Sequence, residues 1–309
     1  MKTYVKDFIK DSTSRGMTPH SISTYTSNIR IFLKFVGDPF KVDNNILRDF
    51  LDYLREDMVY TRGKIRKKGV CNQTVHAYFS AIASYYDYLL YAKKLANNPV
   101  PQFRRRYLAR NKKQFNGENS RQLLTLEQVK QLFSLKMHIR EKVVLIILCK
   151  CGMRRGELIS LDLSDLNLEK GEIILKPKAK RTNRLVFFDD EAAQVLKEYL
   201  KWRAPRAKSS ALFISPAGAR IHKDEPNRIL AKYARKLGFH NPRGPLNKRA
   251  TPHCFRHFFT TILRKNNMRR EFIQELRGDK RRETVDIYDH IDLIELKEAY
   301  LRCIPKLFK

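Results

Sequence analysis

A histidine, an arginine and a tyrosine near the C-terminal end of the chain have the types and spacing to act on a phosphate group. His253 and Arg256 are three residues apart, so on a helix they share one face. Thr251 and Pro252 predict that such a helix begins just before them, because threonine caps free amides and proline fits the first turn. A helix N-terminus favours an anion, and phosphate is the anion that this pattern indicates.

Tyr288 lies in a polar stretch, residues 284–290, rather than in an apolar run. A phenol has a pKa near ~10 and must lose its proton before it can attack, so a nucleophilic tyrosine needs cationic neighbours and a base. Single residues of these types usually pack or face solvent, and the chain has 14 tyrosines. The prediction therefore rests on the joint spacing.

This segment resembles the tyrosine recombinase (integrase) family. In that family the second conserved motif, or box, reads His-x-x-Arg-His and is followed by Leu-x-Gly-His and then by the nucleophilic tyrosine. The chain has the first motif at residues 253–257, Leu276-Arg277-Gly278-Asp279 in place of the second, and then Tyr288. The interval from Asp279 to Tyr288 matches that of the family, whereas the residue type at position 279 does not.

An upstream string also resembles the family. Residues 151–158, CGMRRGEL, are similar to its first box, Gly-x-Arg-x-x-Glu-Leu, and this places the first catalytic arginine at Arg154. On a helix Arg155 would point away from the side that Arg154 faces, so it would either have no catalytic role or contact a phosphate. We expect Glu157 to orient or cap rather than to react.

The family keeps its catalytic lysine on a β-hairpin. Residues 161–188 alternate and contain two turns, which predicts such a hairpin. The spacing to Arg184 favours Lys178 as the catalytic lysine, while Lys176 and Lys180 remain alternatives because hairpin length varies.

The resemblance implies one mechanism for these residues. Arg154 and Arg256 would offset charge on the nonbridging oxygens, and His253 would bind the phosphate or assist proton movement. Lys178 would protonate the departing 5′ oxygen, and Tyr288 would form a covalent 3′-phosphotyrosyl link. The resemblance further implies strand exchange by four protomers on two DNA sites, with no metal, ATP or other cofactor.

Asp279 stands where the family has a hydrogen-bond donor aimed at the phosphate, and an ionised carboxylate aimed there would repel it. Three arrangements avoid this conflict: Asp279 braces Arg154 or Arg256, it is held protonated, or Lys280 supplies the donor. We favour bracing, because neighbouring arginines stabilise the charged carboxylate.

Composition indicates a globular protein that binds a polyanion. The chain has 309 residues, 42% of them hydrophobic, and 63 Lys and Arg against 32 Asp and Glu, a formal charge of +31. Basic side chains gain affinity for nucleic acid by releasing counterions, so double-stranded DNA is the expected partner, although RNA-binding proteins share this feature. We expect no membrane span and no signal peptide, and a cytoplasmic, nucleoid-associated protein. The five scattered cysteines indicate packing thiols and no metal site.

The N-terminal part, residues 1–108, is expected to be helical, and its set of helices resembles the core-binding (SAM-like) domain of the family. Apolar residues recur at helical spacing in 18–36, 44–55 and 72–94. Residues 97–101 are expected to end the bundle, and 61–69 to form a basic loop or helix lead-in. The basic residues expected to contact DNA are Arg62, Lys64, Arg66, Lys67, Lys68, Arg104, Arg105, Arg106 and, in the catalytic part, Lys180.

Residues 109–122 are expected to form a basic linker, and residues 123–309 are expected to form a mixed α/β catalytic domain. Helices are expected near 125, over 141–150, 191–203 and 227–237, and from 252 onward. Residues 293–309 predict a short amphipathic docking tail, because a helix of this length is unstable alone. The fold class is therefore mainly α with a small β-sheet (α+β).

Two other functions fit the same residues. A type IB topoisomerase uses a similar constellation as a monomer, and a DNA-binding protein with a decayed active site would explain the missing histidine at 279. If Tyr288 is not the nucleophile, Tyr300 is the second candidate.

Overall fold

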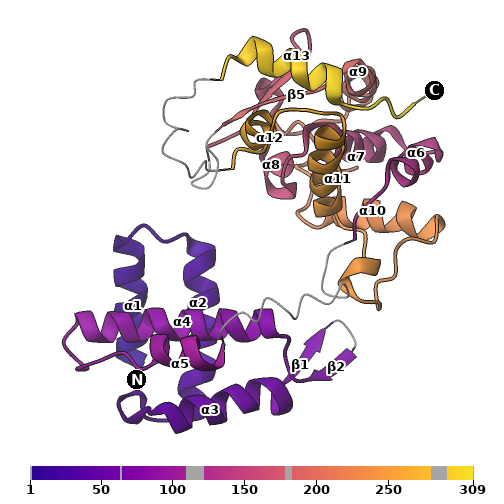
Figure 1. Ribbon diagram of the computed structural model, residues 1–309. Helices are drawn as coiled ribbons and strands as arrows, with labels where there is room; N and C mark the ends of the chain where they lie inside the picture. The colour runs from indigo at the N-terminus through magenta and orange to yellow at the C-terminus, as the bar shows by residue number, and fades with distance from the viewer. Residues whose placement is uncertain (1, 63–64, 109–121, 178–182, 280–290, 309) are drawn as a thin grey trace. The chain divides into compact units, whose positions relative to one another are not determined.

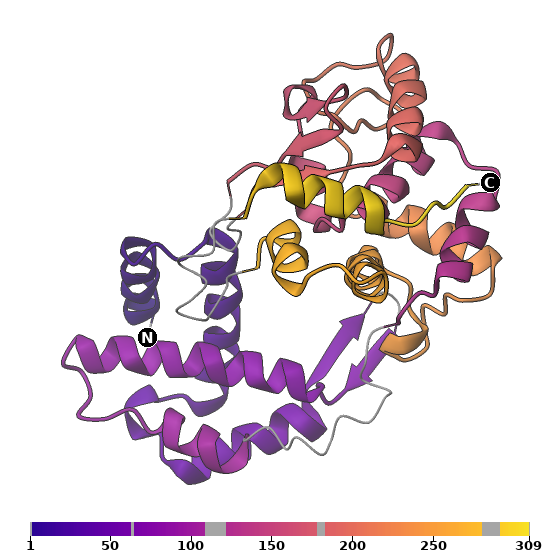
Figure 2. The same cartoon turned by 45° about the horizontal axis from the view of Figure 1, so that its top comes forward.

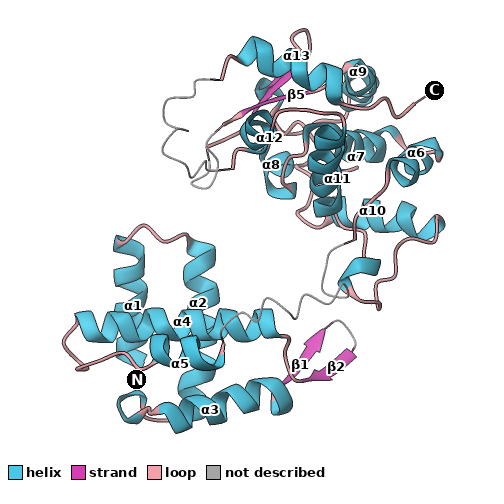
Figure 3. Ribbon diagram, in the orientation of Figure 1, coloured by secondary structure: helices cyan, strands magenta, loops and turns pink. Residues whose placement is uncertain are grey.

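A computed structural model of the chain describes residues 2–62, 65–108, 122–177, 183–279 and 291–308 (Figure 1). Lys178, Lys180, Lys280 and Tyr288 lie outside the described residues, as does most of the predicted linker. The chain divides into two compact units, Met1–Lys112 and Lys113–Lys309. Helices dominate both units, and each also has a small antiparallel sheet (Figure 3). The expected fold class is confirmed.

The first unit is a helical bundle with a short β-hairpin at one end (Figure 1). Its elements are α1 (Lys2–Ser14), α2 (Pro19–Val36), a 3-10 turn (Pro39–Lys41), α3 (Asn44–Asp52) continued by a π-helical turn (Tyr53–Asp57), β1 (Val59–Arg62), β2 (Ile65–Lys68), α4 (Asn72–Tyr91) and α5 (Val100–Tyr107). Helix α4 packs across α1 and α2, and most of its aromatic side chains lie in the core, whereas Tyr91 at its end is exposed. Phe8, Phe32, Phe50 and Phe79 are completely buried, so these aromatic residues stabilise the bundle by packing.

Two sequence-based expectations for this unit were wrong. The segment 61–69 contains paired strands, not a loop or helix lead-in: β1 and β2 are antiparallel, with Thr61 opposite Arg66. The bundle also does not end at residues 97–101, because Pro101 lies in the first turn of α5, where its missing N–H costs no hydrogen bond. Phe103 of α5 is buried and stacks on Phe79.

The second unit is built around α7 (Ile139–Cys151), which is buried from residue 143 to residue 151. Its other elements are α6 (Leu126–Ser134), α8 (Arg155–Ser160), a 3-10 turn (Leu163–Asp165), β3 (Leu166–Asn167), β4 (Glu172–Ile174), β5 (Leu185–Phe187), α9 (Asp190–Arg203), α10 (Glu225–Lys236), a 3-10 turn (Leu246–Lys248), α11 (Pro252–Lys265), α12 (Arg270–Arg277) and α13 (Leu293–Cys303). Helices α9, α10 and α11 pack on α7. The strands follow the order β3-β4-β5, all antiparallel, with Ile173 opposite Val186, which confirms the predicted hairpin.

Helix α13 belongs to the core of this unit, and the expectation of a docking tail is corrected here. Leu296 and Tyr300 are completely buried, and Ile304 is 6% exposed. The Tyr300 hydroxyl donates a hydrogen bond to the backbone oxygen of Lys150, 3.1 Å away. In Figure 2, α13 runs beside the other helices of its own unit. A cut after Leu293 would therefore expose this core, and we no longer expect it to spare DNA binding.

A buried cation fixes the end of the chain. The Lys150 ammonium, 1% exposed, lies 2.6 Å from the carboxylates of Asp189 and Glu191 and donates to the Pro305 backbone oxygen. Glu191 also accepts hydrogen bonds from the backbone N–H groups of Leu307 and Phe308. The C-terminal residues are thus attached to the end of α7, four residues before Arg154.

Lys150→Met is expected to lower the free energy of unfolding of the catalytic unit by about 3–5 kcal/mol, since the buried Asp189 and the partly buried Glu191 would lose their cation. Trp202, the single tryptophan, lies in α9 of this unit, so its fluorescence during urea unfolding measures the effect. Lys197→Met, at an exposed position of α9, is the matched control. A loss below about 1 kcal/mol would show that the cluster is not an anchor.

Candidate active site

Arg154 and Arg256, about a hundred residues apart in the chain, meet at one carboxylate. Arg154 is the residue before α8, and Arg256 lies in the second turn of α11. Nη2 of Arg154 is 3.4 Å and Nη2 of Arg256 is 3.2 Å from Oδ1 of Asp279. The structure therefore brings together three of the residues that the sequence predicts for the site.

Glu157 orients Arg154 in the way expected from the sequence. Its carboxylate accepts hydrogen bonds from the Arg154 backbone N–H at 2.7 Å and from Nη1 at 3.0 Å. This contact caps the start of α8 and fixes the guanidinium at the same time. Arg155 instead pairs with Asp224 at 3.5 Å and is not part of the arginine cluster.

Arg256 is held almost completely inside the protein, with 3% of its side chain exposed. It donates hydrogen bonds to the backbone oxygens of Gly152 at 2.9 Å and Arg277 at 2.8 Å, besides its contact with Asp279. Burial and the positive charges of Arg154 and Arg277 lower the pKa of Arg256 to about 10. The guanidinium therefore remains charged at neutral pH.

Gly152 makes this close approach possible. It ends α7 with φ 57°, a left-handed conformation that other residues adopt rarely. A Cβ at this position would lie 2.4 Å from the Phe259 ring. The glycine of the first box thus lets α7 and α11 meet where Arg256 reaches the Gly152 oxygen.

The helix carrying His253 and Arg256 begins at Pro252, as the sequence predicts, but its cap differs. The side chain of Thr251 makes no capping hydrogen bond; the Cys254 sulfur instead accepts from the Thr251 backbone N–H at 3.3 Å. His253 is exposed in the first turn, and its ring contacts that of His257 edge-on at 4.7 Å between centroids. His253 is therefore accessible from solvent while Arg256 is covered.

Arg277 was not among the site residues predicted from the sequence. Its Nε atom is 2.9 Å from Oδ2 of Asp279, and its backbone oxygen accepts from Arg256. Arg277 occupies the x of the motif Leu-x-Gly-His, where the family specifies no residue type. The one signal in the sequence was that a charged residue stands here, two positions before the aspartate that replaces the histidine of the motif. Three guanidinium groups therefore surround the Asp279 carboxylate.

Lys176 is engaged elsewhere. It forms an ion pair with Asp162, whose carboxylate also accepts from Arg220 and Ser210. The Lys176 ammonium, together with Arg220, holds the pKa of Asp162 well below its usual range. This arrangement disfavours Lys176 as the catalytic lysine and leaves Lys178 and Lys180.

Tyr300 cannot replace Tyr288 as the nucleophile. It is completely buried, and burial raises the pKa of its hydroxyl well above the usual value of a phenol. Its hydroxyl is also committed to the Lys150 backbone oxygen.

Several of the basic residues expected at DNA lie on the surface of the first unit. Arg66, Lys67 and Lys68 are exposed on β2. Arg104 and Arg105 line a shallow groove between α4 and α5, with His76 and Gln73 from α4. Arg106 is exposed on α5, whereas Arg62 and Lys64 have no described side chain.

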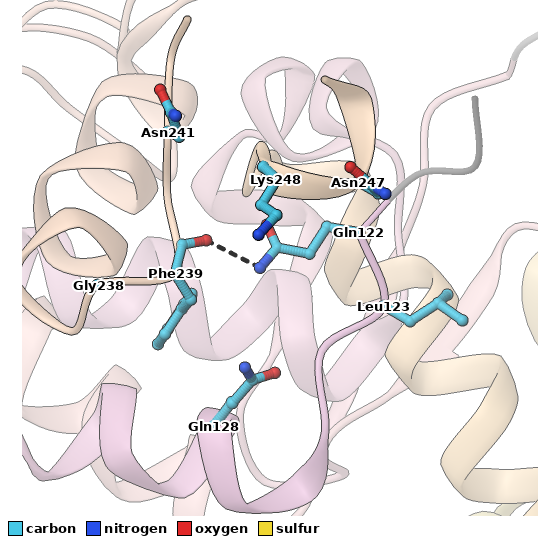
Figure 4. A pocket seen from close by; sticks show the side chains of 8 residues that line it. All are labelled: Gln122, Leu123, Gln128, Gly238, Phe239, Asn241, Asn247 and Lys248. Carbon is cyan, nitrogen blue, oxygen red and sulfur yellow. Dashed lines mark hydrogen bonds between the residues drawn. The ribbon is translucent and has the colours of Figure 1, made fainter. Parts of the chain in front are cut away.

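A hollow of about 500 Å³, lined by both polar and apolar residues, lies beside the first described residues of the second unit (Figure 4). Gln122, Asn241, Asn247 and Lys248 are among its lining residues, and none of the cluster around Asp279 lines it. The Gln122 side chain donates to the Phe239 backbone oxygen at 2.8 Å and is 9% exposed. Gln122, the last residue of the predicted linker, is thus packed into the second unit.

The comparisons with known proteins agree with these motifs. The model of the phage integrase family matches residues 122–293, and that of the phage integrase SAM-like domain matches residues 1–106. Tyrosine recombinase XerD of Listeria monocytogenes serotype 4b is 27% identical over 99% of this chain and 100% of its own. Tyrosine recombinase XerC of Thermodesulfovibrio yellowstonii is 28% identical over 98% and 96%.

Solved structures show the same fold. The Tn1549 transposon integrase in complex with transposon right end DNA has a TM-score of 0.68 at 17% identity, over 96% of this chain and 97% of its own. The XerH recombinase bound to difH has a TM-score of 0.62 at 21% identity, over 92% and 80%. Within the described residues, no helix is long and apolar enough to cross a membrane. The matched motifs, the converging arginines and the family models together show that the chain belongs to the phage integrase family of tyrosine recombinases.

Proposed function

We propose that the protein is a site-specific DNA recombinase that cleaves and rejoins strands through a covalent 3′-phosphotyrosyl intermediate. The observation that carries this function is the convergence of Arg154 and Arg256, each from its family box, on one point. The relatives are tyrosine recombinases, and solved neighbours are integrases and recombinases bound to DNA. These matches lend no support to the topoisomerase or the decayed-protein alternative.

The proposed step exchanges one phosphodiester for another. The Tyr288 oxygen attacks phosphorus, its proton passes to a base for which His253 is the candidate, and the bond from phosphorus to the 5′ oxygen breaks. The departing oxygen takes a proton from Lys178, and the DNA 3′ end stays linked to Tyr288. Attack by a 5′ hydroxyl from a partner strand reverses the step, so the exchange consumes no ATP.

Arg154 and Arg256 would stabilise the transition state, in which negative charge grows on the two nonbridging oxygens. Their guanidinium groups are fixed before DNA binds, by Glu157 in one case and by Gly152 and Arg277 in the other. Donors that are already oriented need no reorganisation during the reaction, which is the main source of such stabilisation.

The proposed partners follow from the charge and the relatives. Double-stranded DNA would bind to basic residues of both units, including the exposed Arg66, Lys67 and Lys68. We further propose a tetramer on two DNA sites and nucleoid association. The proposed division is a DNA-binding domain over residues 1–108, a linker that begins at 109 and ends where Gln122 packs into the second unit, and a catalytic domain from 123.

The general acid is predicted to be Lys178. In a substrate with sulfur at the 5′-bridging position the leaving group needs no proton, so Lys178→Ala should cleave it within about threefold of wild type. On the normal substrate the same variant should be slower by about 10²–10⁴-fold. Lys180→Ala is the matched control, and rescue of that variant instead would assign the acid to Lys180.

Asp279 is predicted to brace the arginines. Asp279→Asn should lower single-turnover cleavage about tenfold, and Asp279→Ala about a hundredfold, because charge-assisted hydrogen bonds are progressively lost. Lys280→Ala should have little effect. If Lys280→Ala is the most impaired variant, the donor has moved to residue 280 and bracing is wrong.

The test of the proposed function begins by selecting the DNA sequence that the protein binds. A nicked duplex carrying that sequence loses a short fragment after cleavage, which prevents religation and traps the covalent complex. The wild-type protein should form a complex that survives denaturation. Binding without such a complex would contradict the enzymatic function.

A further inference from the structure

Asp279 is bound by three arginines rather than by the two that the family boxes supply. Oδ1 is contacted by Arg154 and Arg256, and Oδ2 lies 2.9 Å from Nε of Arg277. Arg277 is the last residue of α12, and Gly278 then turns the chain in the left-handed conformation, with φ 59°. This turn brings the side chains of Arg277 and Asp279 together.

The backbone of Arg277 is tied to the same cluster. Its oxygen accepts a hydrogen bond from Nη2 of Arg256 at 2.8 Å. The Asp279 N–H donates to the Gln274 oxygen at 3.1 Å, which continues the ordered end of α12. Arg277 is therefore positioned by both its main chain and its side chain.

The cluster gathers positive charge around Asp279. Arg154, Arg256 and Arg277 are three cations in contact with this one carboxylate, and Glu157 also contacts Arg154. Burial, followed by the charges of Arg154 and Arg277, lowers the pKa of Arg256. A phosphodiester carries one negative charge and therefore suits a site built from guanidinium groups.

Exposure indicates which arginines such a phosphate can reach. The side chain of Arg256 is 3% exposed, whereas those of Arg154 and Arg277 are 39% and 32% exposed. Arg256 already donates to two backbone oxygens and to Asp279. DNA arriving from solvent would therefore meet Arg154 and Arg277 over a larger surface than it meets Arg256.

Position 279 also lacks the donor that the family motif supplies. An ionised carboxylate only accepts hydrogen bonds, so a phosphate oxygen would remain one donor short. Arg277, which contacts Asp279 through Nε, carries a guanidinium group of the kind that binds phosphate.

We propose that Arg277 is a third catalytic arginine, which binds a nonbridging oxygen of the scissile phosphate and supplies the donor that residue 279 lacks. This inference rests on the proposed function. The competing explanation is that Arg277 only holds Asp279 and the end of α12 in place.

A substrate with a methylphosphonate at the scissile position separates the two explanations. The methyl group replaces one nonbridging oxygen and removes the negative charge, so an arginine that neutralises this charge becomes less important. Wild type, Arg277→Gln and Arg277→Lys are compared on phosphate and on methylphosphonate in single-turnover cleavage of the nicked duplex. Arg264→Gln removes the same charge from the exposed end of α11 and is the control.

On the phosphate substrate, Arg277→Gln should be slower than wild type by about a hundredfold, Arg277→Lys should lie between them, and Arg264→Gln should cleave like wild type. On the methylphosphonate, the deficit of Arg277→Gln should shrink to below about tenfold. DNA affinity of Arg277→Gln should match that of Arg264→Gln.

An equal deficit on both substrates would make Arg277 structural, and no deficit on either would remove it from the site. Both results would overturn this inference while the proposed function stands, because wild type still cleaves. Absence of cleavage by wild type would instead overturn the proposed function.

Discussion

Tyr288→Phe is expected to bind DNA with unchanged affinity and to form no covalent complex. The substitution removes only the phenolic oxygen, which is the atom that would bond to phosphorus, so the loss should reach the limit of detection. The measurement is denaturing gel electrophoresis of the protein with the nicked duplex, alongside a binding titration.

Tyr300→Phe is the matched control. Its hydroxyl makes one hydrogen bond to the Lys150 backbone oxygen, so the variant should lose about 1 kcal/mol of stability and still form the complex. If Tyr288→Phe forms the complex and Tyr300→Phe does not, the nucleophile has been assigned to the wrong residue and the core position of α13 would have to change.

Arg256→Ala is expected to lower single-turnover cleavage by at least about 10³-fold, at the upper end of what the loss of one transition-state donor costs. The effect should be large because Arg256 connects the Gly152 oxygen, the Arg277 oxygen and Asp279. Its removal therefore takes away a phosphate ligand and also the link between α7, α11 and the end of α12.

Arg256→Lys keeps the charge but cannot make the forked contacts, so it should recover only a small part of the rate. Trp202 fluorescence during urea unfolding checks that the variants are folded. Cleavage by folded Arg256→Ala within about tenfold of wild type would exclude Arg256 from the reaction.

The catalytic half was predictable where the chemistry depends on local spacing. Arg154, Glu157 and Arg256 lie in strings whose intervals define a helix start or a helix face, and the structure places them as the sequence implies. The contact of Asp279 with the two arginines could be anticipated because a carboxylate near them has few other stable arrangements. Its third partner, Arg277, depends on the turn at Gly278, which the motif does not specify.

Other features depend on packing that the sequence does not display. The α13 helix is amphipathic, and its pattern alone does not say whether its apolar face is covered by its own unit or by another molecule. The buried Lys150 decides this point, since its carboxylate and backbone partners lie 39 to 155 residues away. The β1-β2 hairpin was missed because its strands are rich in basic residues that also suit a solvated loop.

The central claim is a covalent bond between Tyr288 and the 3′ end of cleaved DNA. The most direct measurement is to trap wild-type protein on the nicked duplex, digest both components, and identify the modified peptide by mass spectrometry. We predict a nucleotide joined through its 3′ phosphate to Tyr288, in the peptide that follows the arginine cluster. A nucleotide on any other residue, or a 5′ linkage, would contradict the account.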